Sequence, residues 1–274
     1  MIPWSDLPGK RAAQKLYLAY TPIWGAACGV VMLGGLAERW GDAPLLALGF
    51  GLWIPLVAAG FLRRAPEDRG RPWYRLYHAK LSLFVAVFAF LGNWFGTRHF
   101  YEVLDMHYGF RTSLYWNDVP VFLYPLTAVY FTTYAVLFDL AVAAAGRVGL
   151  PRVLAVVVSA LALAFLETGL NANPWMASTF CYGSLGFALS FGTLMYGSHF
   201  VLAGPLWRRI DEDPGRETTL AEAAIAGFAA MMLVLCVDEV WARTVAPRFT
   251  TVVPGRVGIP GKQAASCLRP AGTR

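Results

Sequence analysis

The sequence predicts an all-α fold, a polytopic membrane bundle of about seven transmembrane helices, and two observations support this prediction. Of the 274 residues, 57% are hydrophobic and only 15% are charged, whereas an average soluble domain carries about 25% charged residues. The hydrophobic residues also gather into long runs. This composition excludes a soluble enzyme. The formal charge of +6 does not indicate nucleic-acid binding, because the basic residues lie between the apolar runs.

Seven apolar stretches have the length needed to cross a hydrocarbon core about 30 Å thick, which is about 20 helical residues. In chain order they are Leu16–Ala37, Ala43–Leu62, Leu81–Phe100, Val119–Phe138, Val153–Ala172, Phe180–Trp207 and Ala223–Ala242. The fourth run continues past Asp139 to Gly146, so that helix is displaced or tilted. We divide the chain into an N-terminal segment (1–15), a transmembrane domain (16–242) and a polar C-terminal tail (243–274).

The basic residues predict the orientation of the bundle. Fourteen Lys and Arg residues lie on the side of the N-terminus, and three lie on the other side before the tail adds six. The positive-inside rule therefore predicts a cytoplasmic N-terminus. The first 15 residues lack the short apolar core of a signal peptide, so we expect them to be retained. The expected location is the endoplasmic reticulum in a eukaryote or the inner membrane in a bacterium.

Three polar residues fall inside the predicted spans. Glu167 follows 14 uncharged residues from Val153, Asp238 follows 15 uncharged residues, and Asn93 is the thirteenth residue of its run. Fourteen residues make about 21 Å of helix, which is too short to cross the core. All three helices run outward in this topology, so the three side chains share the non-cytoplasmic leaflet. The other polar residues expected in that leaflet are Arg98, His99, Asn171 and Asn173.

A carboxylate near the centre of a membrane helix costs roughly 2.5–3.5 kcal/mol, so such residues usually face a cavity and have a function. Asn171 stands one turn after Glu167, on the same helix face. The alternative is a buried ion pair of Glu167 or Asp238 with Arg98 that only holds helices together. His99 ends a stripe of small residues, and a structural hydrogen-bonding role competes with a catalytic one there.

Aromatic residues are interleaved with these polar groups. They fit either an aromatic belt at the membrane interface or an apolar pocket whose aromatic ring faces stabilise a cation. The four cysteines lie far apart without metal-ligand spacing, so we predict no metal site.

Eight short motifs occur in the order and spacing of one family. They are Tyr20-Thr-Pro-Ile-Trp24, Gly92-Asn-Trp-Phe-Gly-Thr-Arg-His-Phe100, Tyr108-Gly-Phe110, Asn117-Asp-Val-Pro120, Leu166-Glu-Thr168, Tyr182-Gly, Arg209-Ile-Asp-Glu212 and Asp238. Over about residues 10 to 245 the chain resembles the cycloeucalenol cycloisomerase family, the plant cyclopropyl sterol isomerases. It departs from the plant pattern with Gly96 in place of a tryptophan, Arg98-His99 in place of a His-Tyr pair, and Asp118 in place of an asparagine.

The resemblance implies a sterol isomerase that opens the cyclopropane ring of a substrate such as cycloeucalenol or cycloartenol, without a cofactor. Protonation of the bridging methylene makes a methyl group, and a neighbouring ring carbon then loses a hydrogen. The predicted catalytic residues are Glu167 as the acid, Asp238 beside the carbocation, and His99. The predicted substrate-binding residues are Asn93, Trp94, Tyr108, Tyr115, Asn117, Asn171 and Tyr182.

The expected partners are therefore a cyclopropyl sterol and the lipid bilayer. The alternative class is a non-enzymatic membrane protein, either a sterol-binding module or a proton-coupled transporter in which the two carboxylates form a relay.

Overall fold

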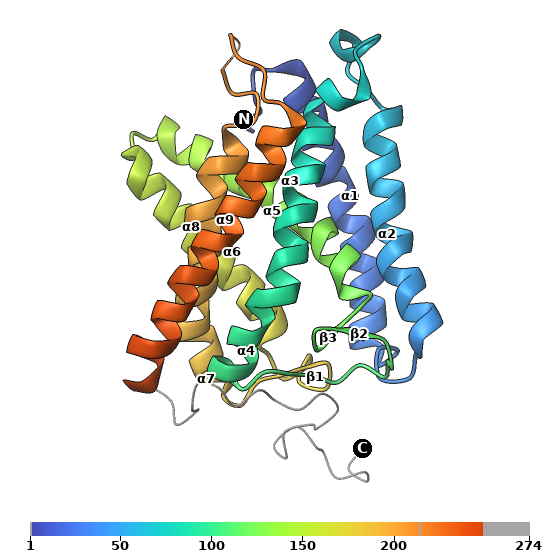
Figure 1. Ribbon diagram of the computed structural model, residues 1–274, viewed down its shortest axis with the longest axis vertical. Helices are drawn as coiled ribbons and strands as arrows, with labels where there is room; N and C mark the ends of the chain where they lie inside the picture. The colour runs from blue at the N-terminus through green and yellow to red at the C-terminus, as the bar shows by residue number, and fades with distance from the viewer. Residues whose placement is uncertain (1, 214, 249–274) are drawn as a thin grey trace.

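The computed structural model describes residues 2–213 and 215–248 as a bundle of long helices (Figure 1). In this part of the chain, seven helices are long and apolar enough to cross a membrane. The prediction of an all-α polytopic bundle is therefore confirmed. The spans are Pro8–Leu33, Asp42–Leu62, Tyr77–Leu104, Leu123–Arg147, Arg152–Asn171, Leu185–Arg208 and Leu220–Arg248. Most of the predicted C-terminal tail, from residue 249 onward, lies outside the described residues.

Four of the spans are single α-helices, and three contain a π-helical turn. The continuous ones are α1 (Pro8–Leu33), α2 (Asp42–Leu62), α5 (Leu123–Arg147) and α6 (Arg152–Asn171). In the third span, the π turn Gly92–Gly96 joins α3 (Tyr77–Leu91) to α4 (Thr97–Leu104). In the sixth span, the π turn Ala188–Gly192 joins α7 (Leu185–Phe187) to α8 (Thr193–Arg208). In the seventh span, α9 (Leu220–Val240) is followed by the π turn Trp241–Val245 and the 3₁₀ turn Ala246–Arg248. Such turns occur frequently at functional sites.

The sequence predicts that the first span begins at Leu16, but the first helix begins at Pro8. Proline suits the first turn of a helix, because the amide hydrogen that it lacks has no partner there. The buried Lys10 ammonium group lies 2.8 Å from the carboxylate of Glu212. The polar segment therefore packs against the bundle as part of a helix.

The fourth span also differs from the prediction, because it runs from Leu123 to Arg147 instead of from Val119 to Phe138. Val119 is part of a short strand, and the helix continues past Asp139. The Asp139 carboxylate is buried 3.8 Å from the Lys10 ammonium group. Its charge therefore has a partner within the protein.

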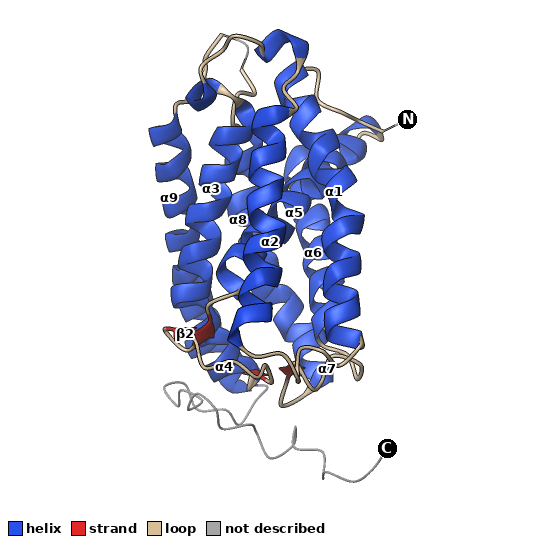
Figure 2. Cartoon of the chain, turned by 90° about the vertical axis from the view of Figure 1, so that its right-hand side faces the viewer, coloured by secondary structure: helices blue, strands red, loops and turns tan. Residues whose placement is uncertain are grey.

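Two short antiparallel strand pairs lie at the end of the bundle opposite the N-terminus (Figure 2). The strands are β1 (His107–Tyr108), paired with β4 (Phe180–Cys181), and β2 (Tyr115–Trp116), paired with β3 (Val119–Pro120). Because Phe180 pairs as a strand, the sixth span begins at Leu185 rather than at Phe180. Between β2 and β3, Asn117 and Asp118 have φ angles of 46° and 65°. Two successive left-handed residues, one of them an asparagine, fit a two-residue hairpin turn of type I′.

Glycines allow two pairs of helices to approach closely. A Cβ atom on Gly227 of α9 would lie 2.7 Å from the backbone oxygen of Phe84 on α3. On α8, a Cβ atom at Gly197 would lie 2.9 Å from a methyl carbon of Leu161 on α6. Small residues at helix crossings allow such close backbone approach in membrane bundles.

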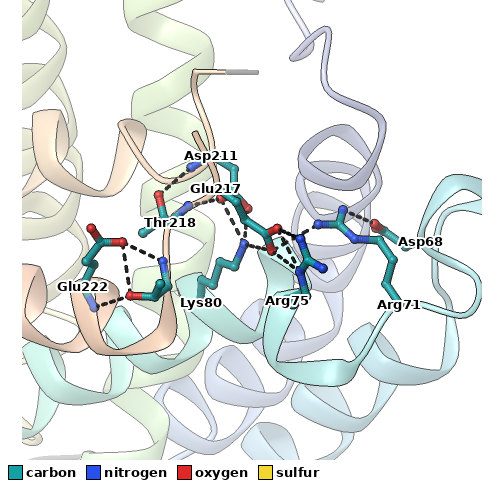
Figure 3. A network of polar contacts seen from close by, with 9 residues as sticks. Asp68, Arg71, Arg75, Lys80, Asp211, Glu217, Thr218 and Glu222 are labelled. Atoms are coloured by element: carbon teal, nitrogen blue, oxygen red, sulfur yellow. Dashed lines mark hydrogen bonds and ion pairs between the residues drawn. The ribbon is translucent and has the colours of Figure 1, made fainter. Parts of the chain in front are cut away.

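A polar network ties together the loops at the N-terminal end (Figure 3). The fully buried Lys80 ammonium group lies 2.8 Å from Asp211 and 3.0 Å from Glu217. Arg75 also pairs with Glu217, as does Arg71 at 3.1 Å. The network joins the start of α3 to the loop between α8 and α9.

We predict that Glu217→Gln lowers the midpoint of thermal unfolding at neutral pH by roughly 2–4 °C, the shift expected for a loss of about 1 kcal/mol. The Arg75 guanidinium group, with help from Lys80, lowers the pKa of Glu217 to about 2. A carboxylate with a lowered pKa stabilises the fold above its ordinary pKa and loses this contribution as the pH falls toward the lowered value. The difference in midpoint between wild type and Glu217→Gln should therefore shrink between about pH 5 and about pH 3. A constant difference across this range would contradict the role of the charge.

The predicted orientation of the bundle can be tested by labelling. Glu67 is exposed in the loop between α2 and α3, and Trp175 is 79% exposed at the strand-bearing end. With a membrane-impermeant thiol reagent, Glu67→Cys should react only from the cytoplasmic side and Trp175→Cys only from the other side. Labelling of both positions from one side would contradict the seven spans, and exchanged sides would invert the orientation.

Candidate active site in the bundle interior

A partly open cavity of about 100 Å³ lies among α3, α4, α5, α6 and α8, toward the strand-bearing end. Its walls are largely aromatic, with a few polar groups between the rings. The lining residues are Phe88, Ala89, Gly92, Asn93, Thr97, Phe100, Met106, Tyr108, Thr127, Tyr130, Phe131, Glu167, Asn171, Phe180, Tyr182, Tyr196 and His199. An apolar cavity with a few convergent polar groups is the usual form of a small-molecule site.

Among the lining residues in the described part of the chain, Glu167 is the one that carries a carboxyl group. Its side chain accepts a hydrogen bond from the Tyr134 hydroxyl, and the Asn171 amide donates to its Oε1 atom at 3.0 Å. The contact with Asn171 is the one that the spacing of the two residues predicts. Both partners of the carboxyl group are uncharged, so a protonated, neutral Glu167 suits the apolar surroundings.

Asp238 lies one layer outside the cavity, which differs from the predicted position beside a carbocation. Its side chain is fully buried on α9, but it is not among the lining residues. The Ser198 hydroxyl donates to its Oδ1 atom at 3.1 Å, and its Oδ2 atom lies 3.9 Å from Nε2 of His199. Helix α9 packs against α3 and α8, and of this pair of residues His199 lines the cavity while Asp238 does not.

His99 lies apart from the cavity, in an outer groove of about 650 Å³ between α4 and α9. Its Nε2 atom is 3.2 Å from the carboxylate of Glu239. In the same groove, Arg98 pairs with Glu102 at 2.6 Å, and Arg243 pairs with Glu239. Neither Glu167 nor Asp238 has Arg98 as an ion-pair partner in the described part of the chain, so the structural ion pair considered above is not formed there.

The predicted substrate-binding residues divide into two groups. Asn93, Tyr108, Asn171 and Tyr182 line the cavity. The other three belong to the hairpin and its contact and do not line it: Trp94, Tyr115 and Asn117. The Asn117 amide donates to the backbone oxygen of Trp94, and its left-handed backbone forms the turn, so a structural role accounts for its motif.

Several residues of the site were missed by the sequence analysis, above all His199. This histidine is buried in the middle of an apolar span, and an ionisable residue inside a span is itself a signal of function. Tyr134 and Tyr196 gave no comparable signal, because tyrosine is also common at membrane interfaces.

Comparison with known proteins assigns the family. A protein from Arabidopsis thaliana named cycloeucalenol cycloisomerase is 30% identical over 245 residues, which cover 85% of this chain and 86% of that protein. The chain belongs to the cycloeucalenol cycloisomerase family. Membership of this family supports an isomerase as the class of enzyme. No family model matches the chain, and no solved structure matches it.

Three of the motifs that carry the resemblance have different structural settings. Leu166-Glu-Thr168 brings Glu167 to the cavity, and Asn117-Asp-Val-Pro120 forms the hairpin. Arg209-Ile-Asp-Glu212 lies in the loop at the N-terminal end, where Asp211 pairs with Lys80 and Glu212 with Lys10. These motifs therefore contribute to the cavity wall, to the hairpin and to the contacts between helix ends.

Proposed function

We propose that the protein is a cofactor-free isomerase that opens the cyclopropane ring of a cyclopropyl sterol, with Glu167 as the acid. The observation that carries this proposal is one buried carboxyl group on the wall of an aromatic cavity inside a membrane bundle. A cyclopropane accepts a proton but forms no strong hydrogen bond. Its acid must therefore be kept protonated and held against the carbon by the protein.

Each surrounding group has a place in this reaction. The amide of Asn171 and the hydroxyl of Tyr134 orient the Glu167 carboxyl group. Transfer of its proton to the bridging methylene leaves a carbocation on the sterol and a carboxylate on Glu167, which stabilise each other in a low-dielectric site. The rings of Tyr130, Phe131 and Tyr196 add π faces and exclude water.

Substrate entry requires the cavity to widen. Its volume of about 100 Å³ is below the roughly 300–1,000 Å³ of pockets for drug-sized ligands. We therefore propose that lining side chains or helices move apart when a sterol enters from the bilayer. The family assignment supports an enzyme over the sterol-binding or transporter alternative.

The test is to incubate the purified protein with a cyclopropyl sterol such as cycloeucalenol. A product of unchanged mass, with a new methyl signal and a ring double bond in its NMR spectrum, is the expected result. Recovery of only the unchanged sterol from the folded protein would overturn the proposal.

A further inference from the structure

A buried histidine and a buried aspartate form a pair that begins at the cavity and extends away from it. His199 on α8 lines the cavity, and Asp238 on α9 lies behind it with no exposed surface. The Nε2 atom of His199 and the Oδ2 atom of Asp238 are 3.9 Å apart. In the described part of the chain, Oδ2 has no hydrogen-bond partner, so this carboxylate oxygen is available to a protonated imidazole.

A second buried histidine, His78, has a structural role and serves as a comparison for His199. His78 on α3 has both ring nitrogens engaged, with the Tyr17 hydroxyl at 2.6 Å and the Val57 backbone oxygen at 2.9 Å. In contrast, His199 lines the cavity, and its Nε2 atom lies 3.9 Å from the buried Asp238 carboxylate. The surroundings of His199 therefore differ from those of His78, because His199 faces the cavity on one side and a buried carboxylate on the other.

The surroundings of His199 suit a base that becomes charged only during the reaction. The ring centroid of Tyr196 lies 4.8 Å from that of His199, and those of Phe88 and Phe100 lie 6.3 and 6.5 Å away. These rings keep the resting imidazole in apolar surroundings. When the imidazole gains a proton, the Asp238 carboxylate stabilises the resulting cation, as in other aspartate–histidine pairs.

We propose that His199 is the base that completes the isomerisation and that Asp238 is a positioning residue behind it. This inference rests on the proposed function and names the proton acceptor that a ring opening with Glu167 as the acid requires. Both groups reach the same cavity, Glu167 from α6 and His199 from α8. The acid and the base therefore contact one substrate from two neighbouring helices.

The proton transfers balance without any further reactant. The electron pair of the breaking cyclopropane C–C bond takes the proton of Glu167 and forms the new C–H bond of the methyl group. His199 then takes a proton from the carbon beside the cation, and the electron pair of that C–H bond becomes the ring double bond. Transfer of this proton from the imidazolium to the Glu167 carboxylate restores both residues.

The test compares wild type, His199→Gln and the matched control His78→Gln in D₂O, with cycloeucalenol as the substrate and enzyme in excess. We expect His199→Gln to form product at least about 100-fold more slowly, the lower end of general-base catalysis. The acid still works in this variant, so the carbocation should revert or lose another proton. Deuterium in the bridging methylene of the recovered sterol, or a double bond at a different ring position, is therefore expected. His78→Gln should show neither change.

The possible outcomes separate this inference from the proposed function. Absence of conversion by wild type overturns both. Conversion by wild type together with normal turnover by His199→Gln overturns the role of His199 alone. So does slow turnover by His199→Gln that gives the wild-type product and leaves no deuterium in the recovered sterol, because a structural defect would slow every step together.

Asp238→Asn tests the positioning role. The amide keeps the shape of the side chain and removes its charge, so kcat should fall by roughly 10-fold or more while KM stays near the wild-type value. The recovered sterol should again contain more deuterium than with wild type. An unchanged kcat, or a rise in KM alone, would overturn the role of Asp238.

Discussion

Turnover of a cyclopropyl sterol should fall by at least about 100-fold when Glu167 is replaced by glutamine, because general acid catalysis contributes about 10²–10⁴-fold. The amide retains the shape of the side chain and can still contact Tyr134 and Asn171, but it has no acidic proton. Initial rates of product formation by purified wild type and Glu167→Gln, compared at equal amounts of folded protein, measure this effect.

The matched control is Glu239→Gln. Glu239 is a half-exposed carboxylate in the outer groove, where it contacts His99 and Arg243. Its replacement changes the same chemical group outside the cavity, so turnover should stay within about twofold of wild type, well short of an acid-catalysis effect. Near-normal turnover by folded Glu167→Gln would remove Glu167 from the mechanism.

A sterol-shaped amine with its nitrogen near the position of the carbocation should bind more tightly than the substrate by at least about 100-fold, as transition-state analogues do. The ammonium group imitates the cation, and Glu167 is the lining carboxyl group that can pair with it. Glu167→Gln should therefore weaken binding of the amine far more than binding of the neutral sterol, because only the amine loses a charged partner. Competition binding to detergent-purified protein measures both affinities.

The same comparison with Asp238→Asn distinguishes the two carboxylates. Asp238 lies behind His199, so its replacement should weaken the amine less than Glu167→Gln does. Equal losses for the amine and the neutral sterol in Glu167→Gln would contradict an ion pair at the cavity wall. A larger loss with Asp238→Asn would show that the cation approaches α9 instead.

The fold was predictable because hydropathy and charge determine where membrane spans lie. The boundaries at Pro8, Leu123 and Leu185 were not, because they depend on tertiary contacts and strand pairing at the ends of the helices. A hydropathy run contains no information about whether Val119 continues a helix or pairs with Trp116. The burial of Asp139 beside Lys10 likewise depends on two segments far apart in the sequence.

Only two properties of the sequence predicted residues of the candidate site: the depth of a residue in the membrane and its position in the helix period. These two properties led to Glu167, Asn93 and Asn171, all of which line the cavity. They also indicated Asp238, at the right depth but on a helix behind the wall. Rotation of each helix about its axis determines which side chain reaches a cavity, and packing among several helices sets that rotation. For the same reason, the sequence analysis named His99 and missed His199.

The central claim is that ring opening begins with a proton from the protein, and a single turnover in D₂O tests it most directly. Wild-type protein, equilibrated in D₂O and present in excess over a cyclopropyl sterol, exchanges its acidic proton before the substrate is added. We predict a product with one deuterium atom, located in the new methyl group. A product without deuterium in that methyl group, or recovery of only the cyclopropyl sterol, would contradict the account.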